Sequence, residues 1–128
     1  MKATGKINLE IKGKNKALGY AFNMKHRRLF MERRGIQFFS EYGQTILNCI
    51  PEKDQEMNIN QLYIFGDLLL TAIQSVEGET VDLDTDELLE QLIVKPEEIQ
   101  KVLTEFLAAQ EQEKKGGKTS SQGKSKKK

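Results

Sequence analysis

One long apolar stretch, residues 57–78, constrains the fold of this chain more than any other feature. Asn58 and Gln61 have the spacing of a capping box, so a helix is predicted to begin here. Apolar residues then recur at helical spacing and leave only a narrow polar strip, made of Asp67, Thr71, Gln74 and Ser75. Gly78 is a suitable terminator. We therefore expect a central helix at about residues 59–76, with other elements covering most of its surface.

The N-terminus is predicted to form an amphipathic β-hairpin over about residues 6–22. Apolar and polar residues alternate in two runs, with a polar, glycine-containing turn at residues 13–16 between them. The apolar members are Ile7, Leu9, Ile11, Leu18, Tyr20 and Phe22. An isolated hairpin is only marginally stable, so the later helices must cover its apolar face.

Four more helices are predicted from caps and apolar spacing, at about residues 24–34, 38–50, 85–93 and 96–115. The first is rich in arginine and lysine, and His26 is expected on its surface. Asp84 and Glu87 form a second capping box, and Pro96 suits the first position of the last helix. The expected fold is therefore α+β, a single domain over residues 1–115 in which about four helices pack on the hairpin. Residues 116–128 hold only Gly, Lys, Thr, Ser and Gln and are predicted to be a disordered tail.

Charge is strongly segregated along the chain. Ten basic against three acidic residues give +7 from Met1 to Asn48, and three against sixteen give −13 from Cys49 to Glu113. Seven lysines without an acidic residue then give +7 from Lys114 to the end. This division favours contacts between the first and second segments, either within one chain or between copies in a homo-oligomer.

The inventory of reactive groups argues against an enzyme. His26 has no nearby carboxylate in sequence to orient it, and Cys49 lies in an apolar setting typical of a small buried hydrophobe. The acidic run at residues 82–87 lacks the glycine and the terminal glutamate of a calcium loop. We expect no catalytic residue, no metal site and no cofactor. No secretion signal or membrane-spanning stretch is recognised, which favours the cytoplasm and argues against a membrane partner.

The terminal lysines are the one feature that suggests nucleic acid, because clustered lysines gain affinity for phosphate by releasing counterions. The tail has no aromatic residue for base stacking, however, and it adjoins the acidic segment. A solvating tail is the favoured interpretation. A small nucleic-acid-binding accessory protein, using the basic helix and the tail, is retained as an alternative.

The order of the elements resembles that of a known family. A hairpin with the aromatic strand of residues 18–22 leads into the basic helix of residues 23–35. The apolar helix of residues 62–73, the acidic step of residues 81–89 and the closing helix of residues 95–107 come next. In this pattern, over about residues 7–110, the chain resembles the small tail assembly chaperones of long-tailed bacteriophages.

The resemblance implies a non-enzymatic helper in the host cytoplasm. Such chaperones coat the long helical tape measure protein, keep it soluble, recruit tail tube protein subunits and are absent from the finished tail. The partner surface is expected on apolar stripes of the basic and closing helices, at Leu29, Phe30, Ile99, Val102 and Phe106, although the same stripes must also build the core. A structural virion component, such as a tail or connector subunit, is a further alternative.

Overall fold

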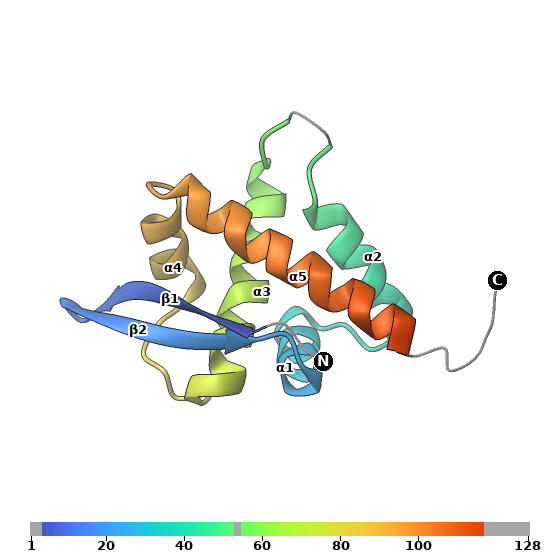
Figure 1. The fold of residues 1–128 in the computed structure, drawn as a ribbon, viewed down its shortest axis with the longest axis horizontal. Coiled ribbons are helices and arrows are strands. Elements are labelled where there is room, and N and C mark those ends of the chain that lie inside the picture. Colours follow the sequence, from blue (N-terminus) through green and yellow to red (C-terminus); the bar gives the residue numbers. More distant parts are fainter. Residues whose placement is uncertain (1–3, 53–54, 117–128) are drawn as a thin grey trace.

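The computed structural model, which describes residues 4–52 and 55–116, consists of a two-stranded antiparallel sheet followed by five helices (Figure 1). The strands are β1 (Thr4–Ile11) and β2 (Lys14–Ala21). The helices are α1 (Met24–Arg34), α2 (Phe39–Cys49), α3 (Ile59–Glu77), α4 (Thr85–Leu92) and α5 (Pro96–Gly116). The α+β class is therefore confirmed. The predicted disordered tail lies outside the described residues, apart from Gly116, which is the last residue of α5.

The hairpin is tighter than the sequence suggested. Lys12 and Gly13 form a two-residue turn in which both φ angles are positive, 50° and 79°. The prediction of a turn at residues 13–16 was therefore wrong in position. A two-residue turn of this kind matches the twist of the strands, so that strand pairing begins directly with Ile11 and Lys14. On β1 the predicted alternation holds, with Ile7, Leu9 and Ile11 buried.

Helix α3 is the centre of the molecule, as predicted. It contacts β2, α1, α2 and α4, and every residue from 64 to 73 is buried (Figure 1). The Asn58 side chain accepts from the Gln61 amide at 2.8 Å, and the Gln61 side chain accepts from the Asn58 amide at 2.9 Å. The polar strip was predicted wrongly in part, because Asp67 and Thr71 are buried beneath neighbouring helices.

Helices α4 and α5 cover the hairpin along β1, whereas α3 covers it along β2. Both contact β1, and α5 runs obliquely across the molecule (Figure 1). The Phe106 ring lies 5.0 Å from the Phe22 ring, centre to centre, and the Tyr20 hydroxyl donates a hydrogen bond to Glu105. At the start of α4, Asp84 and Glu87 form the predicted capping box. The acidic run before α4 thus has a local structural role.

The expected contacts between the basic and acidic segments occur within the chain. Among the described residues, four ion pairs join positions far apart in the sequence, with nitrogen to oxygen distances between 2.6 and 3.8 Å. They are Lys12 with Asp82, Arg28 with Glu79, Arg33 with Asp67, and Arg34 with Asp67.

Candidate partner-binding site

The five residues predicted to bind a partner do not share an exposed surface. Leu29 and Phe30 on α1 are buried, as are Val102 and Phe106 on α5. Their apolar stripes face the rest of the fold, so these four side chains serve the core and leave no surface for a partner in this structure. Only Ile99 is partly exposed, where it lines a groove.

An open apolar groove, the α1–α2 groove, lies between α1 and the start of α2. Its volume is about 410 Å³, and its walls are Met24, Lys25, Arg28, Met31, Glu32, Ile36 and Phe39. The Met24 and Phe39 side chains are each 54% exposed. Met31 and Ile36 are partly buried against the core, so they form the floor. Scattered apolar residues are normal on a surface, whereas several that share one groove indicate a binding site.

Local turn chemistry creates this groove. The Asn23 side chain caps α1, accepting from the His26 amide at 2.9 Å. Gly35 ends α1 with a φ of 68°, and the Ile36 amide then donates to the Met31 carbonyl at 2.8 Å. The chain turns back here, and Glu41 accepts from the amides just before α2. Phe39, the first residue of α2, is thereby placed beside α1.

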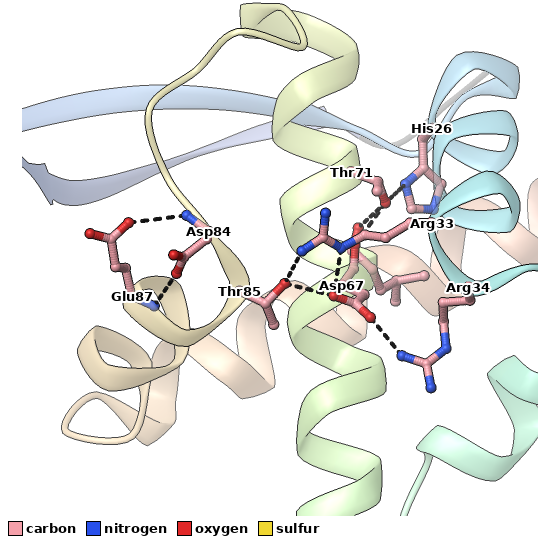
Figure 2. A network of polar contacts seen from close by, with 9 residues as sticks. His26, Arg33, Arg34, Asp67, Thr71, Asp84, Thr85 and Glu87 are labelled. Atoms are coloured by element: carbon pink, nitrogen blue, oxygen red, sulfur yellow. Dashed lines mark hydrogen bonds and ion pairs between the residues drawn. The ribbon is translucent and has the colours of Figure 1, made fainter.

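A polar network fixes α1 from its inner side (Figure 2). The two oxygens of the buried Asp67 carboxylate accept from Arg33 Nε at 2.9 Å and from an Arg34 guanidinium nitrogen at 2.6 Å. Thr85, at the start of α4, donates to Asp67 at 2.6 Å and accepts from Arg33 at 2.8 Å. The network joins α1, α3 and α4 and turns two arginines away from the groove. The sequence offered one signal for it, an aspartate within an apolar helix.

His26 was expected at the surface, and that prediction was wrong. Its side chain is fully buried, with ring centres 5.3 Å from Phe22 and 6.1 Å from Phe30. The ring Nδ1 lies 3.1 Å from the Thr71 hydroxyl, which itself donates to the Asp67 carbonyl at 2.8 Å (Figure 2). Burial, and secondarily the charge of Arg27, lowers the pKa of His26 to about 3. A histidine so placed has no access to a substrate.

Other reactive groups are likewise structural. Cys49 is fully buried, as expected, and burial raises the pKa of its thiol to about 11, which keeps it protonated. Asp84 caps α4, and Asp86 accepts from the Tyr63 hydroxyl at 2.5 Å. Within the described part of the chain, no group of three His, Cys, Asp or Glu residues is placed to hold a metal ion. The same part contains no helix that is long and apolar enough to span a membrane.

A second groove, the α5 groove, lies between α5 and the segment that precedes α3. Its volume is about 320 Å³ and its lining is Pro51, Gln55, Glu56, Met57, Leu62, Ile93, Pro96, Ile99, Gln100 and Leu103. Ile99 is the single predicted partner residue that contributes to it. Among the described residues of its lining, Glu56 alone is charged. The net charge of this lining is therefore negative, whereas that of the α1–α2 groove is positive.

Comparison of the chain with protein-family models, curated proteins and solved structures finds no match. The geometry of the two grooves and the order of elements along the chain are therefore the observations that bear on function.

Proposed function

We propose that this chain is a tail assembly chaperone of a long-tailed bacteriophage, a non-enzymatic binding protein of the host cytoplasm. It keeps the tape measure protein soluble, helps to recruit tail tube protein subunits and leaves before the virion is complete. The family resemblance suggests this role. The observation that carries it is the α1–α2 groove, an open surface lined chiefly by apolar side chains.

The groove suits this work for two physical reasons. A long amphipathic helix precipitates unless its apolar stripe is covered, and a groove of apolar side chains is the usual means of covering one. The groove is also held in shape, because Arg33 and Arg34 tie the end of α1 to Asp67. A surface that is already formed loses little conformational entropy when a partner binds.

The two alternatives predict different observations. Binding of nucleic acid would use the basic helix α1 and the lysine tail, yet on α1 Arg33 and Arg34 already pair with Asp67, which reduces the charge that the helix offers to phosphate. A structural tail or connector subunit would remain in the particle. Mass spectrometry of purified virions distinguishes that role, because a chaperone is absent from them and a subunit is present in a fixed ratio.

Co-expression with the tape measure protein of the same phage tests the proposal directly. We expect the tape measure protein to precipitate when expressed alone, and to become soluble and co-purify in a saturable complex when this chain is present. A tape measure protein that still precipitates contradicts the chaperone role. Steeply salt-dependent binding to DNA or RNA, in the same preparation, would support the nucleic-acid alternative instead.

A further inference from the structure

The α1–α2 groove combines a fixed floor with adaptable walls. Met31 and Ile36 form the floor by packing against the core, while Met24 and Phe39 rise from it, each about half exposed. Methionine side chains are flexible and polarisable, and they adapt to apolar partners of different shape. A row of apolar side chains on a helix could lie between Met24 and Phe39 and exclude water from both.

The charged residues of the groove are two basic ones, Lys25 and Arg28, and one acidic one, Glu32, all on its α1 wall. Arg28 lies 3.4 Å from Glu32 and 3.8 Å from Glu79, but its side chain remains 52% exposed and such exposed pairs are weak. Among the described residues, no carboxylate lies within ion-pairing distance of Lys25. The α5 groove, which contains Glu56, lacks this basic wall in the described part of its lining.

From this pairing of apolar floor and basic wall we propose that the α1–α2 groove docks an amphipathic helix whose apolar stripe is flanked by acidic residues. The inference rests on the proposed function and names the surface and the chemistry by which the partner is held. The apolar stripe covers Met24 and Phe39, and the flanking carboxylates face Lys25 and Arg28. Complementary charge fixes the orientation and discriminates against basic helices of equal hydrophobicity.

The methionine methyl groups provide a direct test by NMR on the full chain. Met24 and Met31 report on the α1–α2 groove and Met57 reports on the α5 groove. The probe is a synthetic amphipathic peptide of about 15 residues, four helical turns, with leucines on one face and glutamates elsewhere. Its control has lysine in place of every glutamate. Single Met→Leu substitutions assign the methyl resonances.

The acidic peptide is expected to shift the Met24 and Met31 resonances and to leave Met57 unchanged. The lysine peptide is expected to bind this groove with an affinity lower by a factor of about ten or more. Shifts of Met57 alone, equal binding of both peptides, or no shift at all would overturn the proposal. So would shifts of Met24 and Met31 with protein concentration in the absence of peptide, because a second copy would then occupy the groove.

Substitutions in the groove provide a second test. Met24→Glu adds an acidic residue to the first turn of α1, which has none, so the helix itself is favoured. We expect this variant to bind the acidic peptide about tenfold more weakly at unchanged thermal stability. Leu47→Glu on α2 is the matched control, since Leu47 is 65% exposed and does not line the groove. Phe39→Ser is a second variant from the opposite wall.

The same variants separate this inference from the proposed function. If Met24→Glu and Phe39→Ser solubilise the tape measure protein as well as the original chain does, the docking surface is wrong and the chaperone role stands. If the acidic peptide binds at Met24 and Met31 while the tape measure protein still precipitates, the docking surface is supported and the chaperone role is contradicted.

Discussion

At the scale of single residues, His26 shows how a side chain of ambiguous chemistry is fixed by its neighbours. The Thr71 hydroxyl has one proton, which it donates to a backbone carbonyl of α3. We infer that Nδ1 of His26 is the protonated nitrogen and donates to the Thr71 oxygen. Among the described residues, Nε2 has no hydrogen-bond partner, so a second proton there would place a charge in an apolar core.

This placement predicts a histidine that does not titrate in the folded protein near neutral pH. Its pKa is lowered to about 3, whereas an unfolded histidine titrates near 6.5. Only the unfolded state takes up a proton between these values. The contribution of His26 to the free energy of unfolding therefore has its full value above about pH 6.5. That contribution falls by up to about 1.4 kcal/mol per pH unit as the pH drops toward 3. His26 is the single histidine, so its ring NMR signals can be followed without ambiguity.

In the native protein, the His26 signals should stay constant from about pH 7.5 to about pH 4.5. In urea the same signals should titrate with a midpoint near 6.5, which serves as the control. A native midpoint close to the urea value would show that the ring is accessible to water, contrary to the structure.

At the scale of elements, most of the architecture could be predicted because its signals are local. Asn58 with Gln61, Asp84 with Glu87, and the glycines after α1 and α3 each act on the backbone within four residues. The hairpin turn was misplaced because Lys12 adopts a positive φ, a conformation that lysine seldom takes and its sequence neighbours do not reveal. Close approach between helices could not be predicted from the sequence either, since it depends on which residues face each other across the fold.

Gly66 illustrates this kind of contact between elements, where α3 meets α4. A Cβ atom at Gly66 would lie 2.8 Å from the Thr85 methyl and 3.0 Å from Leu89. Thr85 cannot move aside without breaking its hydrogen bonds to Asp67 and Arg33. We therefore expect Gly66→Ala to lower the free energy of unfolding by about 1 to 3 kcal/mol, despite the better helix propensity of alanine.

Gly43 in α2 is the matched control for that substitution. It also lies inside a helix, but a Cβ atom there would meet nothing within 4 Å. Gly43→Ala should raise the free energy of unfolding by about 0.5 to 1 kcal/mol through propensity alone. Urea denaturation measures the change in the free energy of unfolding for both variants. Changes of the same sign would contradict the close approach of α3 and α4 at Gly66.

At the scale of the whole molecule, the candidate site was harder to predict than the fold. Apolar spacing identifies a stripe but does not say whether the chain itself covers that stripe. Phe30 and Phe106 therefore proved to be core residues, whereas Met24 and Phe39 remained at the surface. Segregated charge predicted contacts between the basic and acidic segments, but not that Asp67, within an apolar helix, would take two of them.

The ion pairs that join these segments should contribute unequally to stability. Asp67 is buried and binds two arginines and Thr85, whereas Asp82 meets Lys12 at the surface, where both side chains are more than half exposed. Asp67→Asn should lower the free energy of unfolding by about 2 kcal/mol. A larger loss is not expected, because the arginines are 38% and 31% exposed and regain some hydration.

Asp82→Asn removes a charge of the same sign from an exposed position and should cost less than about 0.5 kcal/mol. Urea denaturation near pH 7 measures both substitutions in the full chain, and adding salt should reduce only the small effect at Asp82. Equal losses at the two positions would mean that Asp67 is as well hydrated as a surface carboxylate. The shape of the α1–α2 groove would then depend on apolar packing alone, and Asp67→Asn should leave peptide binding at Met24 and Met31 unchanged.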